Sequence, residues 1–317
     1  MKKVIVTVGP SFFNSNPTSF LNSSDFIFRI NGAHHNASTL EKEINKTRSI
    51  FRDAKILIDL PGNKIRTSNL EFPIELVKGK TMVINSNQTN FSDFHKHLKI
   101  NDVIWASDST LKLVIEKIDD SKITVLSESN GYLLNNKGLH VRGINIGLPF
   151  LFEKDFDIIK IANEKKVSYI GLSFVRNSDD IEIAKKILDS SISIMSKIET
   201  IAAVKNIDSI LSTVDYIIVD RGDLSTEIGI EKVALYQKYI VDKGLFYNKK
   251  VFLATQFLKN MEEKPIPTIA EVIDLYHSLK MGIYGIQLSE ETAIGKFPQE
   301  CIKIIQTVMD QIKSEII

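Results

Sequence analysis

Ser196-Lys197-Ile198-Glu199 and, one helix-sized segment further along the chain, Arg221-Gly222-Asp223-Leu224 each stand at the end of a short apolar run. Each motif is therefore placed where a buried strand is expected to end. A lysine and two carboxylates presented from neighbouring strand ends suit a divalent cation with a phosphorylated anion beside it. Because a parallel barrel brings the carboxyl ends of its strands to one face, the motifs predict one shared site in an α/β protein.

The same pattern, a short β-branched run followed by a helix-sized segment, recurs along the chain. The runs are residues 4–8, 26–30, 56–59, 169–172, 193–196, 216–219, 251–254 and 285–288. Eight strands alternating with helices are typical of a (β/α)8 TIM barrel. Polar or small residues end nearly every run, and in a barrel these ends face the active site. They are Asn31, Asp59, Ser173, Lys197, Asp220, Thr255 and Ser289.

The spacing changes between the third and fourth runs. Here short alternating segments are separated by turn sequences such as Lys78-Gly79-Lys80, Asp119-Asp120-Ser121 and Asn130-Gly131. This predicts a small all-β lid domain, residues 70–146, inserted into a catalytic barrel made of residues 1–69 and 147–317. We expect Trp105, the one tryptophan, to lie in the core of the small domain.

The composition is that of an ordinary globular protein, with 43% hydrophobic and 25% charged residues among 317. The net charge of +1 provides no general attraction for nucleic acid or a membrane surface, so any anion site must be local. We expect the one cysteine, Cys301, to be buried in a helix after Pro298 and unreactive. The N-terminal apolar run is too short for a signal peptide, and no stretch approaches the roughly 20 residues of a membrane span. These features predict a cytoplasmic protein.

Several motifs follow one another at barrel-strand spacing. They are Thr7-Val8-Gly9-Pro10, Arg29-Ile30-Asn31-Gly32-Ala33-His34, Asp59-Leu60-Pro61-Gly62-Asn63-Lys64-Ile65-Arg66, Leu148-Pro149 with Glu153-Lys154-Asp155, Ser173-Phe174-Val175-Arg176, the two motifs quoted first, Ala254-Thr255-Gln256, Pro267-Thr268-Ile269-Ala270-Glu271-Val272, and Leu288-Ser289-Glu290-Glu291-Thr292-Ala293. In this order they resemble the pyruvate kinase family, from Val4 to about Gln311. The resemblance implies a barrel interrupted by a β lid after the third strand, as the spacing predicts independently. It also implies a phosphotransferase that moves the phosphoryl group of phosphoenolpyruvate to a nucleoside diphosphate such as ADP, giving pyruvate and ATP or another triphosphate.

The resemblance also implies roles for single residues. Glu199 and Asp223 would be the ligands of Mg2+ or Mn2+, which prefer carboxylate oxygens. Lys197 would neutralise charge on the transferred phosphoryl group and on the enolate oxygen left behind. Arg29 and Arg66 would contact the transferred phosphate, which a guanidinium fork fits well.

Further residues are expected to bind the substrates. Gly222 and Asp223 would offer backbone N–H groups to the substrate carboxylate at a helix start, where the dipole favours an anion. Thr255 would lie beside the enolate carbon that is protonated, with water delivering the proton. The other expected substrate contacts are Ser173, Asp220 and Ser289, and the expected nucleotide contacts are Pro10, Asn31, His34 and Lys137.

The potassium site of the family is altered. In most members a serine and a threonine help to hold K+, but here Ala33 and Leu60 stand at these positions, and neither offers a side-chain oxygen. In the same segment Lys64 replaces the usual glutamate, as in members that need no monovalent cation. Its ammonium would supply the missing positive charge. We expect activity that needs a divalent cation but no K+.

Other departures leave the substrates open. Asp220 replaces a small residue beside the three-carbon substrate, where a carboxylate is unfavourable unless a cation or donor meets it. Glu290 replaces a glycine, and Thr39 stands near the place of the aromatic residue that would cover the adenine ring. The substrate and the nucleotide preference therefore stay open.

The predicted lid also differs from the family. Asp108 and Lys137 keep the family's residue types, whereas His140 and Arg142 replace an amide and a proline near Lys137. We interpret His140 and Arg142 as an added basic pair that would grip a different acceptor phosphate.

The chain stops soon after the eighth helix, whereas typical members continue into an α/β domain that carries an allosteric sugar-phosphate site. We expect no activation by a sugar bisphosphate, and a monomer or a homodimer built through barrel helices.

Two alternatives to a kinase remain. One is an enzyme of a specialised pathway that uses phosphoenolpyruvate or the pyruvate enolate with another acceptor, which Asp220, Glu290 and the altered lid favour. The other is a non-catalytic binding protein, against which the full set of charged site residues argues.

Overall fold

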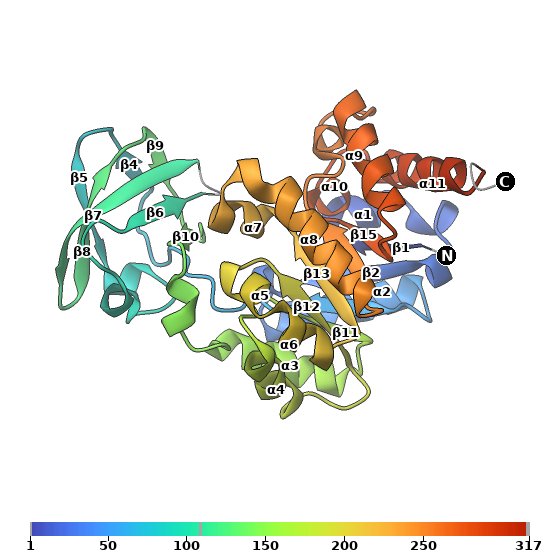
Figure 1. The fold of residues 1–317 in the computed structure, drawn as a ribbon, viewed down its shortest axis with the longest axis horizontal. Coiled ribbons are helices and arrows are strands. Elements are labelled where there is room, and N and C mark those ends of the chain that lie inside the picture. The colour runs from blue at the N-terminus through green and yellow to red at the C-terminus, as the bar shows by residue number, and fades with distance from the viewer. Residues whose placement is uncertain (1, 108–109, 315–317) are drawn as a thin grey trace.

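At the centre of the computed structural model, which describes residues 2–107 and 110–314, lies a closed barrel of eight parallel strands (Figure 1). The strands are β1 (Lys3–Thr7), β2 (Phe26–Asn31), β3 (Ile56–Asp59), β11 (Tyr169–Leu172), β12 (Ser193–Ile198), β13 (Tyr216–Asp220), β14 (Lys250–Ala254) and β15 (Gly285–Leu288). Each pairs with the next barrel strand along the chain, and β15 closes the barrel against β1. The predicted barrel is thereby confirmed, and all eight predicted strands end within two residues of the observed ones.

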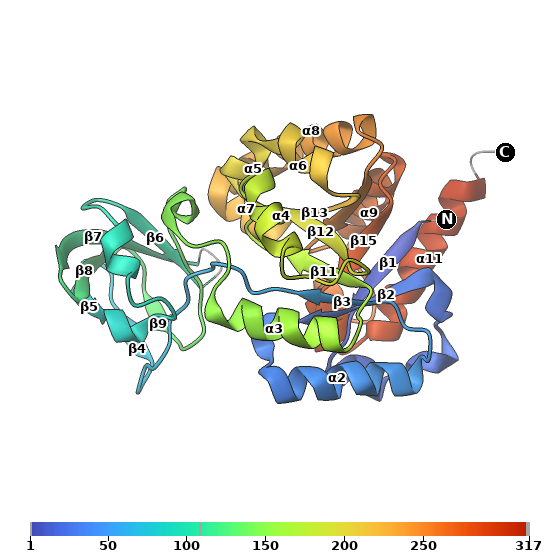
Figure 2. The ribbon, with the colours of Figure 1, turned by 90° about the horizontal axis from the view of Figure 1, so that it is seen from below.

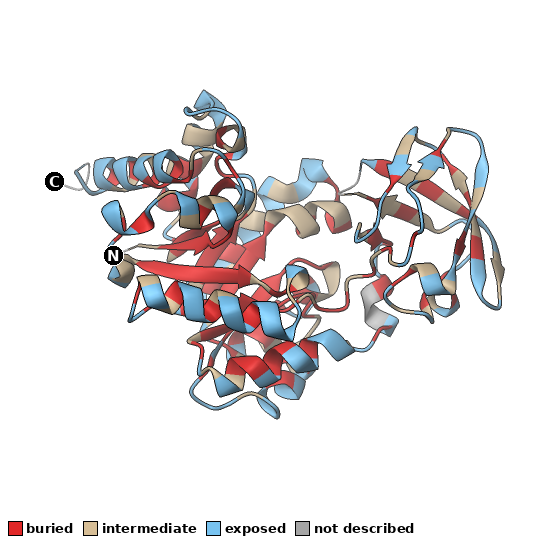
Figure 3. Ribbon diagram, turned by 180° about the vertical axis from the view of Figure 1, so that it is seen from behind, coloured by how far each residue is buried: buried red, intermediate tan, exposed pale blue. Residues whose placement is uncertain are grey.

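Alternation along the strands explains why the barrel is packed on both faces. In β1, Ile5 belongs to a cluster inside the barrel, whereas Val4 and Val6 belong to the larger cluster between strands and helices. Successive side chains of a strand point to opposite faces, so a run that is apolar throughout is buried on both. Figure 3 shows this as strands that are red along most of their length.

Helices form the outer layer, and α2 and α3 lie side by side along one flank (Figure 2). The α-helices are α1 (Pro10–Asn14), α2 (Ala37–Ile50), α3 (Glu153–Glu164), α4 (Ser178–Lys185), α5 (Ile201–Lys205), α6 (Ile207–Thr213), α7 (Arg221–Ile228), α8 (Val233–Phe246), α9 (Ile269–Lys280), α10 (Glu290–Ala293) and α11 (Pro298–Ser314). Local sequence fixes where some begin. Asn36 and Thr39 form a capping box at the start of α2, so the hydroxyl of Thr39 caps this helix.

The segment between β3 and β11 forms two antiparallel sheets at one end of the barrel (Figure 1). Its strands are β4 (Ile74–Leu76), β5 (Thr81–Asn85), β6 (Val103–Ala106), β7 (Leu111–Asp119), β8 (Lys122–Ser127), β9 (Gly131–Leu133) and β10 (Leu139–His140). The order β10-β6-β7-β8-β5 makes one sheet and β4-β9 the other. Because the segment leaves the barrel after β3, it lies at the carboxyl ends of the barrel strands. The boundaries at residues 70 and 146, and the action of the segment as a lid, stay predictions.

The prediction for Trp105 is wrong. In β6 its neighbours Ile104 and Ala106 are buried in the core of the small sheets, whereas Trp105 is only half-buried. Adjacent residues of a strand face opposite sides, so Ile104 and Trp105 cannot both enter that core. The ammonium of Lys112 lies over the indole ring, 5.8 Å from the ring centre.

Cys301 is buried in α11, and burial raises the pKa of its thiol to about 12. A thiol with so high a pKa carries almost no thiolate at neutral pH, as expected for an unreactive cysteine. Among the described residues, no helix is both long and apolar enough to cross a membrane.

Candidate active site

Lys197 is the centre of a polar cluster at the carboxyl ends of the barrel strands. Its Nζ lies 2.9 Å from Asp220 Oδ2 and 3.2 Å from Glu199 Oε2. Asp59 Oδ2 lies 4.0 Å away, and the hydroxyl of Ser173 accepts a hydrogen bond from the ammonium at 3.4 Å. These side chains come from β12, β13, β3 and the loop after β11, so the barrel brings together groups far apart in sequence.

Arg29 adds a second cation from β2. Its Nε donates to Asp59 Oδ2 at 2.7 Å, and its Nη1 donates to Thr7 Oγ1 at 2.8 Å. Both partners are buried, which holds the guanidinium in one orientation. Asp59 therefore lies between the two cations Arg29 and Lys197.

Burial and charge set the protonation of this cluster. Burial alone would lower the pKa of Lys197, but the surrounding carboxylates, Asp220 first, raise it well above its usual range, so the ammonium is charged at neutral pH. Burial raises the pKa of Glu199 to about 8, although Lys197 opposes the shift. The pKa of Asp220 is lowered despite its burial, because Lys197 and the hydroxyl of Thr255 stabilise the ionised form.

The start of α7 closes one side of the cluster. Thr255 Oγ1 donates to Asp220 Oδ1 at 2.7 Å, and Asp223 Oδ1 lies 2.5 Å from Lys64 Nζ. Gly222, which has no side chain, lies between Asp220 and Asp223 in the chain. A Cβ there would approach the Thr255 methyl carbon to 3.0 Å, which is tighter than ordinary contact. The glycine thus lets the first turn of the helix lie close to Thr255.

Three residues at this end of the barrel have a left-handed backbone. The φ angles are 56° for Phe174, 78° for Thr255 and 57° for Gln256. A left-handed conformation is unfavourable for a residue with a side chain, and such strain gathers at functional sites. The turn at Phe174 directs its N–H to Glu199 Oε1 at 2.7 Å, which fixes the buried carboxylate.

The carboxylates of Glu199, Asp220 and Asp223 offer one oxygen each within 4.8 Å of one another. Carboxylate oxygens are the ligands that Mg2+ and Mn2+ prefer. Glu199 Oε2 is buried and receives no hydrogen bond, so it has a lone pair to give to a cation. The donor set therefore fits a divalent cation.

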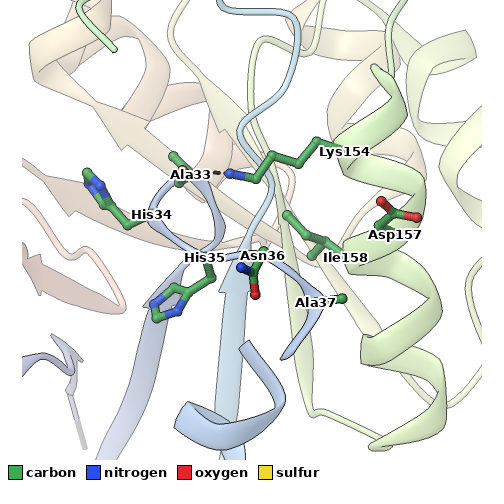
Figure 4. A pocket seen from close by; sticks show the side chains of 8 residues that line it. All are labelled: Ala33, His34, His35, Asn36, Ala37, Lys154, Asp157 and Ile158. Carbon is green, nitrogen blue, oxygen red and sulfur yellow. Dashed lines mark hydrogen bonds between the residues drawn. The ribbon is translucent and has the colours of Figure 1, made fainter. Parts of the chain in front are cut away.

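Two cavities adjoin each other, since Ala33 and Lys154 line both. The first, of about 400 Å3, lies between the start of α2 and α3 (Figure 4) and is lined by Ala33, His34, His35, Asn36, Ala37, Lys154, Asp157 and Ile158. The second, of about 330 Å3, is lined by residues of the barrel and of the small sheets, among them Arg66, Asn136 and Lys154. Lys154 extends from α3 across both, and its ammonium donates to the carbonyl of Ala33 at 2.7 Å. Cations thus face a space of the size of a small ligand.

The structure gathers some predicted site residues and leaves others outside the Lys197 cluster. Those in or against the cluster are Arg29, Ser173, Lys197, Glu199, Asp220, Gly222, Asp223 and Thr255. Arg66 and His34 line the cavities instead, and Lys137 follows Asn136 at the second one.

The remaining predicted contacts are placed in turns at the same end. Asn31 accepts a hydrogen bond from the N–H of Ala33, and Pro10 begins α1. Ser289 precedes α10, and its N–H donates to Glu291 Oε2 at 2.7 Å. Whether these three contact a ligand stays a prediction.

Leu60 and Ala33, at the positions where most family members hold K+, lie in different environments. Leu60 is buried in the apolar core, and Ala33 lines both cavities. Neither side chain has an oxygen. The ammonium of Lys64 reaches Asp223, so a positive charge is present at the mouth of the barrel.

The interpretation of His140 as one of a basic pair is wrong. Burial lowers the pKa of His140 to about 4, so the ring is neutral at neutral pH. Its Nε2 lies 3.4 Å from Glu227 Oε1, and Arg142 Nε donates to the carbonyl of Thr226. Both residues thus contact the barrel helix α7. Asp108, the other lid residue considered, lies outside the described residues.

Sequence reasoning assigned no role to three residues, although it placed Asp59 among the strand ends that face the active site. Asp59 pairs with Arg29, Thr7 accepts from the same guanidinium, and Lys154 lines both cavities. All three residues belong to motifs quoted above, so membership of these motifs could have identified them as site residues. Their partners depend on which strands become neighbours, which a single motif does not show.

The fold and the buried cluster of charged residues at the strand ends are those of a (β/α)8 barrel enzyme. The family model "Pyruvate kinase, barrel domain" matches residues 1–302. The chain belongs to the pyruvate kinase family, whose members are phosphotransferases and generally need a divalent metal.

Comparison with curated proteins gives the same result. The chain is 32% identical to "Pyruvate kinase" of Thermotoga maritima over 99% of its own length and 71% of that protein. It is 32% identical to the protein of the same name from Thermococcus litoralis, over 96% and 68%, and 33% identical to that of Borreliella burgdorferi, over 90% and 63%. The chain thus spans about two thirds of the length of these relatives.

Proposed function

We propose that the protein transfers the phosphoryl group of phosphoenolpyruvate to a nucleoside diphosphate, giving pyruvate and a nucleoside triphosphate, and that it does so without K+. The observation that carries the proposal is the buried ammonium of Lys197, held among carboxylates at the mouth of the barrel. Membership of the family supports the choice of substrates.

Lys197 and Arg29 would hold the phosphoryl group in transit. The transferred group is strongly anionic, so two fixed cations with little access to water stabilise it more than solvated ones do. Arg29 is already oriented by Asp59 and Thr7. Arg66 and Lys154 line the second cavity, where Arg66 would contact the transferred phosphate and Lys154 the phosphates of the nucleotide.

Glu199 and Asp223 would hold the divalent cation. When bound, it supplies positive charge beside the phosphate oxygens. The N–H groups at the start of α7 would bind the substrate carboxylate, because the first turn of a helix leaves such donors free. Gly222 lets this first turn lie close to Thr255.

Thr255 would lie beside the enolate carbon of the product that is protonated. Its O–H donates to Asp220, so the lone pairs of the hydroxyl oxygen are left to orient a water molecule. That water would deliver the proton. The small sheets, acting as a lid, would exclude other water so that transfer competes with hydrolysis.

Independence from K+ rests on three residues. Ala33 and Leu60 have no side-chain oxygen for the ion, and the Lys64 ammonium already stands beside Asp223. A fixed ammonium supplies the charge that a monovalent cation would bring.

The test is formation of pyruvate and nucleoside triphosphate from phosphoenolpyruvate with a panel of nucleoside diphosphates. It is run with Mg2+ or Mn2+, in buffers whose monovalent cation is either K+ or tetramethylammonium. Turnover that is equal in the two buffers supports the proposal. Turnover only with K+ contradicts the ion independence, and no turnover with any diphosphate contradicts the acceptor.

A second candidate is an enzyme that uses phosphoenolpyruvate or the pyruvate enolate with another acceptor. Asp220 favours it, because this buried carboxylate occupies part of the space beside Lys197. Metal-dependent binding of phosphoenolpyruvate without turnover in the assay above would select this candidate.

We also propose that the protein is a monomer or a homodimer in solution. Helix α8 exposes the apolar side chains of Leu235, Tyr239 and Phe246, a surface that a second copy would cover. Light scattering after gel filtration measures the mass directly, and a tetramer would contradict the proposal.

A further inference from the structure

We propose that Asp220 is a third carboxylate ligand of the divalent cation, together with Glu199 and Asp223, and that these carboxylates hold Lys197 and Lys64 until the cation binds. The two-carboxylate site rests on the proposed function. The role of Asp220 as a ligand goes beyond it.

The positions of the oxygens carry the first step. The ligand oxygens of Glu199, Asp220 and Asp223 lie within 4.8 Å of one another. Two oxygens bound to one Mg2+ at 2.0–2.1 Å are at most about 4.2 Å apart, so small side-chain rotations bring all three onto one ion. Asp220 ends β13 and Asp223 lies in the first turn of α7, so the backbone presents both on the same side of the helix start.

Glu199 supplies an independent observation. Its side chain is completely buried, its Oε1 accepts the N–H of Phe174, and its Oε2 receives no hydrogen bond, although Lys197 Nζ lies 3.2 Å away. This buried oxygen is faced by the Lys197 ammonium but by no hydrogen-bond donor of good geometry, so a lone pair is available for a cation. It belongs to the same group of carboxylate oxygens as those of Asp220 and Asp223.

The charges around the cluster agree with this assignment. Four carboxylic side chains and three basic side chains meet here. They are Asp59, Glu199, Asp220 and Asp223 against Arg29, Lys64 and Lys197. Asp220 adds one carboxylate to this cluster, and carboxylate oxygens are the ligands that divalent cations prefer.

Each carboxylate of the proposed site is already faced by an ammonium. Lys197 contacts Asp220 and Glu199, and Lys64 contacts Asp223. Glu199, Asp220 and Asp223 would hold the cation through these oxygens, and the ammonium groups of Lys197 and Lys64 would then be available to the anionic substrates. The cation is then needed before the substrate, because without it Lys197 is neutralised by its own carboxylates.

The experiment measures binding of Mn2+ alone, without phosphoenolpyruvate or nucleotide, by the electron paramagnetic resonance signal of the free ion. Asp220→Ala is compared with the unaltered protein, with Asp220→Asn, and with Glu231→Gln. Glu231 is an exposed carboxylate just after α7, so its loss gives the same change in net charge outside the cluster. Circular dichroism verifies that each variant is folded.

We expect Asp220→Ala to weaken Mn2+ binding at least tenfold, on the order of what loss of a supporting carboxylate does to metal sites, and Glu231→Gln to leave it within about twofold. Asp220→Asn keeps the contact with Thr255 but loses the charge, and we expect a weakening between these two. If Asp220→Ala does not fold, Asp220→Asn decides. Affinity in the Asp220 variants that is unchanged, or higher, would show that Asp220 only holds Lys197 and would overturn the proposal.

The result is separable from the proposed function, because no substrate is present. Mn2+ binding that depends on Asp220, in a protein that shows no turnover with any diphosphate, would keep the ligand assignment and reject the kinase. Turnover with a diphosphate, together with Mn2+ binding that does not depend on Asp220, would support the kinase and reject the ligand assignment.

Discussion

Lys64 Nζ and Asp223 Oδ1 lie 2.5 Å apart, which joins the loop after β3 to the first turn of α7. This pair places an ammonium next to an expected metal ligand. It is therefore the contact on which the proposed independence from K+ mainly rests.

Replacement of Lys64 by methionine tests this relationship. We expect Lys64→Met to lower turnover at least tenfold, which corresponds to about 1.4 kcal/mol of transition-state stabilisation. We expect that K+ does not restore turnover, because Ala33 and Leu60 offer no side-chain oxygen to the ion. Turnover is measured in K+ and in tetramethylammonium buffers. Lys80→Met, at an exposed lysine of the small sheets, is the control and should behave as the unaltered protein. Restoration of Lys64→Met by K+ would show that the chain retains a monovalent site.

Replacement of Lys197 by methionine tests the centre of the cluster. We expect Lys197→Met to lose turnover by a factor of at least about a thousand, since the removal of one stabilising charge or donor in such sites has effects of this size. Mn2+ should still bind, because Glu199, Asp220 and Asp223 remain. Initial rates and Mn2+ titration are measured on the same preparation. Near-normal rates would remove Lys197 from the catalytic assignment.

Phe28 tests the packing of the barrel against its helices. The ring is fully buried and stacks on Phe51, with 4.6 Å between ring centres. We expect Phe28→Ala to lower the free energy of unfolding by about 3–5 kcal/mol, because it removes apolar contacts and leaves a cavity. Phe72→Ala is the control, since Phe72 is 72% exposed and its loss should change little. Urea unfolding gives both values, and equal effects would contradict the packing.

His140 makes stability depend on pH. Its pKa is about 4 in the folded protein, because burial disfavours the charged ring, against 6.5 for an ordinary histidine. The unfolded chain thus binds more protons between these pH values. The contribution is complete above about pH 6.5 and is lost as the pH falls toward 4, up to about 3 kcal/mol in all.

The measurement is urea unfolding at pH 7 and pH 5. His140→Gln should show a smaller loss of stability between the two pH values than the unaltered protein, whereas His277→Gln, at an exposed histidine of α9, should show the same loss. A slope that His140→Gln leaves unchanged would mean that the ring is charged or solvated in the folded state.

Cys301 should resist thiol reagents in the native protein. It is buried in α11 and its thiol pKa is raised to about 12, so both access and thiolate are lacking. We expect an aromatic disulfide reagent to react with one thiol per chain in denaturant and with almost none in buffer. Rapid reaction in buffer would indicate that α11 separates readily from the barrel.

The barrel was predictable from sequence because two signals coincide. Apolar runs such as 56–59 are buried on both faces, and a polar or small residue marks the end of nearly every run, so spacing and chemistry indicate the same element. Trp105 shows where this reasoning fails. Its hydrophobicity suggests the core, but the alternation of β6 decides which residues enter it, and the strand register is not visible in composition.

Single site residues were predictable, but their partners were not. Lys197 and Asp220 were identified separately, yet the ion pair between them depends on the parallel pairing of β12 with β13. His140 was wrongly interpreted as a basic residue. Its burial against Glu227 depends on how the small sheets contact α7, and the sequence does not show this contact. Protonation depends on burial, and burial is a property of the tertiary structure.

The pairing of β1 with β15 has a consequence for how the chain folds. The hydroxyl of Thr7 donates to the carbonyl of Leu288, so this contact joins residues 281 positions apart. During synthesis the first strand emerges early and keeps an unpaired edge until the last one has left the ribosome. Contacts of such long sequence separation slow folding, and an open edge favours association with other chains. The barrel should therefore close late, and a nascent chain that lacks β15 is the species most in need of a chaperone.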